Sequence, residues 1–155
     1  MQDALRITAS SIDPGLLALP WSTPLAKWPS ELIVSLPKGL SRHLVRFADL
    51  SGKVVAVKET TDEMARREYE MLGNLARLDV PCVDRVAVIA GRSDADGEPL
   101  AAALVTSHLR FSMPYRALFT RVLRPDTATR LVDALAVLLV RPVSYTHLTL
   151  PTICS

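Results

Sequence analysis

The chain of 155 residues lacks most features that mark specialised classes of protein. Its two cysteines, Cys82 and Cys154, form neither a disulfide framework nor a metal-ligand spacing, which favours a reducing compartment. The longest apolar run, residues 134–140, is too short to span a bilayer. A net charge of +2 is too small to favour nucleic acid or an anionic membrane as a partner. No basic stretch followed by an apolar core opens the chain, so we expect no secretory signal and a cytoplasmic protein.

Apolar residues are plentiful by contrast, at 49% of the chain, which is typical of a domain with its own core. The first 30 residues carry four prolines with Trp21 and Trp28 among them. Prolines at this density prevent a long helix, although Asp13 and Pro14 could begin a short one. We expect an irregular N-terminal wrap over the domain. The alternative is a docking strap that recognises a partner through its tryptophans.

Residues 31–109 alternate short apolar runs with tight turns. This pattern predicts an α+β domain in which five antiparallel strands accompany one helix. The last strand is apolar nearly throughout, so it should be central or buried on both faces. The predicted strands are residues 31–36, 43–50, 54–59, 86–90 and 100–106.

The predicted helix follows the third strand and runs to residue 77. Thr60 and Glu63 fit a capping box, with Thr60 as the N-cap. Apolar residues then recur at helical spacing along one face. This face is predicted to contain Met64, Ala65, Met71, Leu72 and Leu75.

Two sets of polar residues stand out as candidate binding groups. Glu68 lies among the apolar positions of the helix and needs a partner, because desolvating a lone carboxylate is costly. Lys58, near the end of the preceding strand, is the obvious candidate. Glu70 is a rival partner for Lys58, and all three side chains could instead be solvated. In the first connection, Gly39, Ser41 and Arg42 offer a close backbone approach, a hydroxyl and a guanidinium to phosphate oxygens, or simply form a hairpin turn.

The order of three strands, one helix and two strands resembles the small lobe of protein kinases. The motif Val55-Ala56-Val57-Lys58 is similar to the kinase strand motif, and residues 67–72 resemble the conserved helix segment. The resemblance implies that Lys58 holds the ATP α- and β-phosphates and that Glu68 positions Lys58. It also implies that adenine meets backbone groups of a linker formed by Thr106, Ser107, His108 and Leu109.

A closer likeness is to an actinobacterial family of unknown function, whose members carry a kinase-like domain similar to lipopolysaccharide kinases. It covers residues 4–141 and rests on residues 5–8, 20–21, 41–43, 65–70 and 111–116. This likeness implies a nucleotide-binding lobe over residues 31–109 and the start of a helical large lobe over residues 110–141. ATP and Mg²⁺ are then expected cofactors of a longer parent protein.

The chain departs from the kinase pattern in two ways. Its glycine-rich loop is reduced to residues 38–42, with one glycine, and the His-Arg-Asp and Asp-Phe-Gly motifs are absent. Without them the chain has no base for a hydroxyl and no carboxylate for magnesium, so we expect no phosphotransfer by this chain alone. The parent could transfer phosphate to a sugar, a lipid-linked saccharide or another small acceptor. The alternatives are a pseudokinase-type regulatory module and an α+β interaction domain with no nucleotide site.

The C-terminal part divides into two segments. A turn or short helix is expected over residues 112–124, followed by a helix capped by Asp126 that ends at Arg141-Pro142. Residues 142–155 resemble translated sequencing-adapter read-through and are expected to be non-native, with an extended strand as the alternative. We expect no metal site or catalytic pair from His147 and Cys154.

Overall fold

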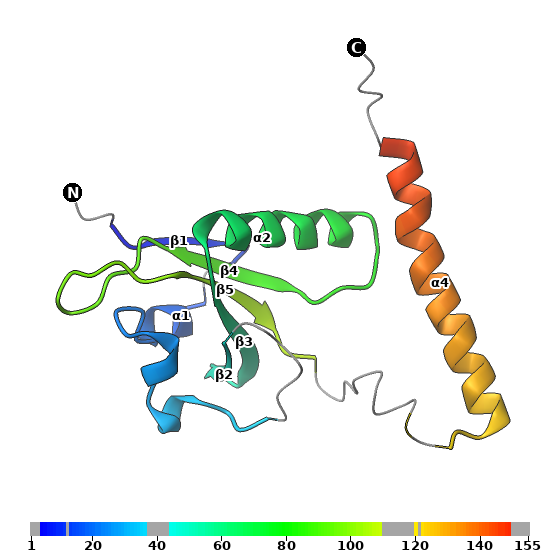
Figure 1. The fold of residues 1–155 in the computed structure, drawn as a ribbon, viewed down its shortest axis with the longest axis horizontal. Coiled ribbons are helices and arrows are strands. Elements are labelled where there is room, and N and C mark those ends of the chain that lie inside the picture. Colours follow the sequence, from blue (N-terminus) through cyan, green and yellow to red (C-terminus); the bar gives the residue numbers. More distant parts are fainter. Residues whose placement is uncertain (1–3, 12, 37–43, 110–119, 121, 150–155) are drawn as a thin grey trace, which may run out of the picture.

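The computed structural model describes residues 4–11, 13–36, 44–109, 120 and 122–149. Within them the chain forms an α+β fold with a five-stranded antiparallel sheet and three α-helices (Figure 1). None of the described helices is long and apolar enough to cross a membrane. The helices are α1 (Gly15–Ala18), α2 (Asp62–Arg77) and α4 (Pro125–Thr149).

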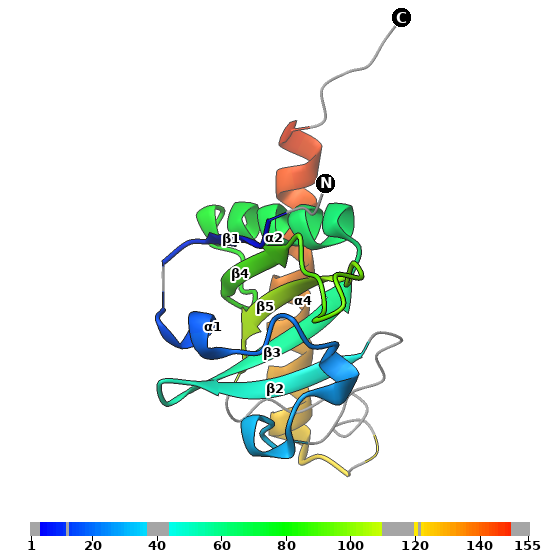
Figure 2. The same ribbon diagram turned by 90° about the vertical axis from the view of Figure 1, so that its left-hand side faces the viewer.

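The sheet has the order β1-β4-β5-β3-β2, which Figure 2 shows, and every neighbouring pair is antiparallel. β5 is central, and its residues from Ala102 to Val105 are all buried, as its apolar sequence predicted. The strands are β1 (Arg6–Ala9), β2 (Val45–Leu50), β3 (Lys53–Thr60), β4 (Arg85–Ala90) and β5 (Ala102–Ser107).

Four predicted strands are confirmed, but the strand predicted over residues 31–36 is wrong. Pro29 leads into a 3-10 turn, Ser30–Leu32, and only Ile33 then forms an isolated bridge, to Ala48 of β2. The fifth strand is instead β1, which pairs with β4 at the opposite edge of the sheet. Both segments are short runs of moderate β-propensity, so long-range pairing decides between them.

One face of the sheet is covered by residues 13–32, called here the wrap (Figure 1). Both tryptophans are buried in the core at 4–5% exposure, and their rings meet edge-on with centroids 5.3 Å apart. The alternative of a docking strap that offers tryptophans to a partner is therefore wrong. The wrap contributes Leu16, Leu19, Trp21, Leu25 and Trp28 to this core.

The opposite face is covered by α2, which packs on β4 and β5. Its N-cap is Thr61, whose hydroxyl accepts from the Met64 amide at 3.3 Å, and not Thr60 as predicted. Thr60 remains in strand conformation because it still pairs with Ala102 of β5. The buried face is also rotated from the predicted one: Met64 and Met71 are about half exposed. Its buried residues are Ala65, Tyr69, Leu72 and Gly73.

The two remaining helices differ from expectation at their ends. α1 begins at Gly15, and the Asp13 carboxylate accepts from the Gly15 amide at 2.8 Å. α4 does not stop at Arg141-Pro142 but continues to Thr149, since a proline removes one hydrogen bond without always ending a helix. Most of residues 112–124, for which a turn or short helix was expected, lie outside the described residues.

Candidate functional site

Lys58 lies on β3, a strand paired on both sides. It is opposite Val45 of β2 and Leu104 of β5, so the backbone that carries the lysine is fixed by two ladders. The Lys58 ammonium donates to the Glu68 carboxylate on α2, which confirms the predicted ion pair. The two side chains are 23% and 33% exposed. The pair is therefore partly accessible to solvent.

A half-buried surface adjoins Lys58 on the same face of the sheet. Strand alternation places Ala56 beside Lys58 on that face, and the register sets Phe47 and Thr106 opposite Ala56. The His108 ring meets the Phe47 ring edge-on at 5.1 Å. We call this surface, formed by Val45, Phe47, Ala56, Lys58, Thr106 and His108, the shelf; all six residues are half-buried.

The shelf contrasts with the opposite face of β3, where Val55 and Val57 are buried beneath the wrap. Sequence reasoning named four of these six residues, through the strand motif and the linker, but missed Val45 and Phe47. The alternation of strand residues would have placed Ala56 with Lys58. No local signal identifies Val45 and Phe47, because their position depends on pairing with β3.

The predicted linker residues are only partly available to a ligand. The Ser107 amide donates to the Asp84 carbonyl, and the His108 amide donates to the Val54 carbonyl, both at 2.9 Å. Ser107 lies opposite Val55, so its side chain is on the other face of the sheet from Lys58. Leu109 is exposed. An adenine ring at this linker would need hydrogen-bonding groups other than these two amides.

The predicted phosphate-binding residues of the first loop, Gly39, Ser41 and Arg42, lie outside the described residues. Their role stays a prediction.

No match to a known protein family was found. No family model matches the chain, and neither do curated proteins or solved structures. The resemblances carried by the sequence therefore stay predictions, and a function has to be inferred from the geometry around Lys58.

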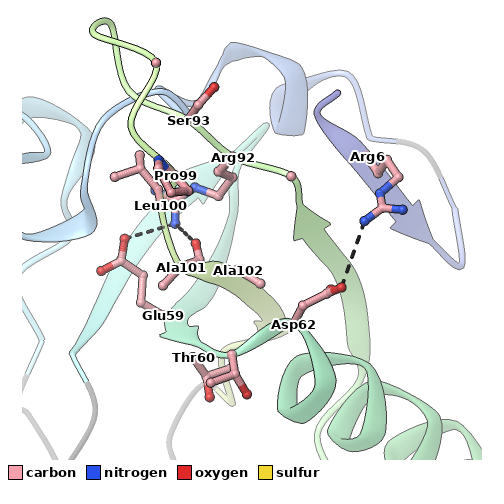
Figure 3. A pocket seen from close by; sticks show the side chains of 13 residues that line it. Arg6, Glu59, Thr60, Asp62, Arg92, Ser93, Pro99, Leu100, Ala101 and Ala102 are labelled. Carbon is pink, nitrogen blue, oxygen red and sulfur yellow. Dashed lines mark hydrogen bonds and ion pairs between the residues drawn. The ribbon is translucent and has the colours of Figure 1, made fainter. Parts of the chain in front are cut away.

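A pocket of about 760 Å³ lies elsewhere and includes neither Lys58 nor Glu68 (Figure 3). It lies between the end of β3, the start of α2 and the β4–β5 connection. Its charged groups already have protein partners: Asp62 accepts from Arg66 at 3.0 Å and lies 4.0 Å from Arg6. This pocket is consequently a weaker candidate than the shelf, despite its size.

Beside this pocket lies a buried charge that the sequence did not reveal. The side chain of Arg92 is fully buried and donates to Glu59 at 2.9 Å. Three more of its N–H groups donate to the carbonyls of Trp21, Thr23 and Ala101 at 2.8–3.0 Å. Arg92 therefore ties the wrap to the sheet, with four of its five N–H donors bonded to protein groups.

Metal-binding residues were not predicted for this chain. In the part of the chain that the structure describes, no three His, Cys, Asp or Glu side chains gather as a metal site would require.

Proposed function

We propose that this chain is the nucleotide-binding small lobe of a kinase-like protein, in which Lys58 binds the ATP phosphates and Glu68 positions Lys58. The observation that carries the proposal is the Lys58–Glu68 pair at the edge of the shelf. A lysine ammonium has three donors, and Glu68 is the partner found for it among the described residues. The other N–H groups of the Lys58 ammonium can donate to phosphate oxygens on the side of the pair that faces solvent.

The shelf supports a ligand with a flat apolar part and an anionic tail. Phe47 and Ala56 offer apolar surface, and Ala56 is small enough to let a ring approach the sheet. Ala56 and Lys58 are two residues apart on one strand, which is about 7 Å at the rise of an antiparallel strand. A purine over Ala56 would thus hold its phosphates near the Lys58 ammonium. An interaction domain without a nucleotide site would not need a paired lysine beside such a surface.

The proposed role of this lobe is to bind nucleotide and not to transfer phosphate by itself. A hydroxyl base and the carboxylates for Mg²⁺ would come from the second lobe of the parent protein. In the parent the acceptor would be a sugar, a lipid-linked saccharide or another small molecule. A parent that binds ATP without transferring phosphate would be a pseudokinase-type module.

Calorimetric titration of the full-length protein with ATP tests the proposal. We expect Lys58→Ala to weaken ATP binding about 10- to 100-fold, since each lost charge-assisted hydrogen bond is worth roughly 1.5–3 kcal/mol. Lys53→Ala is the matched control, because it removes an exposed lysine from the same strand. Adenosine, which has no phosphate, should bind Lys58→Ala as well as it binds the unchanged protein.

Two outcomes would contradict the proposal. One is an unchanged protein that does not bind ATP. The other is an equal loss of ATP affinity in Lys58→Ala and Lys53→Ala, which would indicate a diffuse charge effect. A phosphotransfer assay on a protein that binds ATP then separates a kinase from a pseudokinase.

A further inference from the structure

We propose that Arg85 is a positioning residue that fixes α2, and with it Glu68, so that Glu68 meets Lys58. The inference rests on the proposed function for its effect on ATP, but the contact itself is independent of any ligand. Arg85 is the first residue of β4, directly beneath the helix that carries Glu68.

The Arg85 guanidinium clasps a single turn of α2. One of its nitrogens donates to the Tyr69 carbonyl at 3.3 Å, and its central carbon lies 4.5 Å from the centroid of the Tyr69 ring. The same group lies against Gly73, where an added Cβ would overlap the guanidinium. Tyr69 and Gly73 are four residues apart and so lie one above the other on the helix. We call this contact of Arg85 with Tyr69 and Gly73 the clasp.

The clasp accounts for a glycine inside a helix. Glycine is among the poorest helix formers, yet Gly73 lies inside α2, four residues before the helix ends at Arg77. The space that a side chain would occupy there is filled by Arg85. Gly73 is therefore explained by the close approach of the guanidinium and not by a turn or a helix end.

The position of Glu68 depends on how α2 is seated. α2 packs on β4 and β5, whereas Lys58 lies on β3, beyond β5 in the sheet. Glu68 must therefore reach across from a helix that is anchored on other strands. Glu68 directly precedes Tyr69, so a rotation of α2 that carried Glu68 away from Lys58 would also move Tyr69 and Gly73 against Arg85. The clasp opposes that rotation.

Gly73→Ala tests the clasp without removing a charge. The new methyl group should displace the flexible Arg85 side chain, while alanine favours the helix. We expect the ¹⁵N shift of the Lys58 ammonium to move toward its value in Glu68→Gln, where the ion pair is absent. We also expect ATP affinity to fall roughly 2- to 30-fold, the range for residues that modulate a site without touching its ligand.

Arg85→Met is the second variant, in case Gly73→Ala folds poorly, and it should give the same two changes. Gly73→Ala added to Arg85→Met should change neither measurement further, because the clasp is already lost. Arg77→Met is the control, since it removes an exposed arginine from the same helix.

The outcomes separate this inference from the proposed function. An unchanged Lys58 signal in both variants overturns the clasp, even if the unchanged protein binds ATP. A shifted Lys58 signal in a protein that does not bind ATP supports the clasp and contradicts the proposed function. Equal effects of Arg77→Met and Arg85→Met would overturn the clasp as well.

Discussion

Lys58 and Glu59 are neighbours on β3, and each forms an ion pair on a different face of the sheet. Glu59 pairs with Arg92 beneath the wrap, where the two side chains are 19% and 0% exposed, and it also accepts from the Leu25 amide at 2.8 Å. Lys58 pairs with Glu68 on the other face, where the exposures are 23% and 33%. One pair is enclosed and shares its hydrogen bonds with the backbone of the wrap. The Lys58–Glu68 pair, called here the open pair, is partly exposed to solvent.

The two pairs are expected to differ in what they contribute. A buried charge pair with all its hydrogen bonds made is costly to break, because one partner is left desolvated. A half-exposed pair contributes about 1 kcal/mol or less to folding, since water screens it. Removing one partner of the Glu59–Arg92 pair should thus destabilise the fold. The Lys58–Glu68 pair, in contrast, can bind a ligand at little cost in stability.

The largest expected effect comes from breaking the enclosed pair. Arg92→Met should lower the free energy of unfolding by about 3–5 kcal/mol, because Glu59, which is only 19% exposed, would lose its cation. The carbonyls of Trp21, Thr23 and Ala101 would also lose their donor. Chemical denaturation measures the loss.

Arg6→Met provides the comparison for that experiment, since Arg6 is more than half exposed and lies 4.0 Å from Asp62. Its effect should be within about 0.5 kcal/mol. If Arg92→Met were no more destabilising than Arg6→Met, the expected difference in stability between an enclosed and an exposed ion pair would be contradicted.

The second-largest expected effect on stability comes from the hydrogen bonds that the two tryptophans form within the wrap. The Trp21 indole donates to the Leu16 carbonyl at 2.6 Å, and the Trp28 indole donates to the Thr23 carbonyl at 3.1 Å. Trp21→Phe should cost about 1–3 kcal/mol, because a buried acceptor loses its donor. Trp28→Phe should cost less, since the Thr23 carbonyl still accepts from Arg92. Thermal unfolding of both variants tests this order, and an inverted order would show that ring packing outweighs the hydrogen bonds.

The sequence predicted the open pair and missed the enclosed one, for a physical reason. Lys58 and Glu68 are ten residues apart, on a strand and the helix that follows it. Apolar periodicity therefore made Glu68 a candidate partner, and the kinase resemblance favoured it over Glu70. Arg92 bonds to residues 69 and 71 positions away in an irregular segment. No local pattern in the chain marks a contact of that kind.

The errors in the predicted fold have the same origin. The N-cap moved from Thr60 to Thr61 because pairing with Ala102 keeps Thr60 in the sheet. β1 replaced the strand predicted over residues 31–36 because β4 offered it a partner across some 80 residues of chain, with Arg6 opposite Ala90. The amino-acid composition predicted that a segment could form a strand. Whether that segment joined the sheet depended on a pairing partner far away in the chain.

The last prediction, which has a small expected effect on stability, separates the two ion pairs most clearly. Glu68→Gln should change the free energy of unfolding by about 1 kcal/mol or less, since the two side chains are 23% and 33% exposed. ATP affinity should nonetheless fall several-fold, because Lys58 would lose the carboxylate that orients it. Glu59→Gln makes the same chemical change one residue from Lys58 and should do the reverse, with a larger loss of stability and little loss of affinity. Glu59 is enclosed and points to the other face, so a fall in ATP affinity for both variants would mean that folding, and not the orientation of Lys58, controls binding.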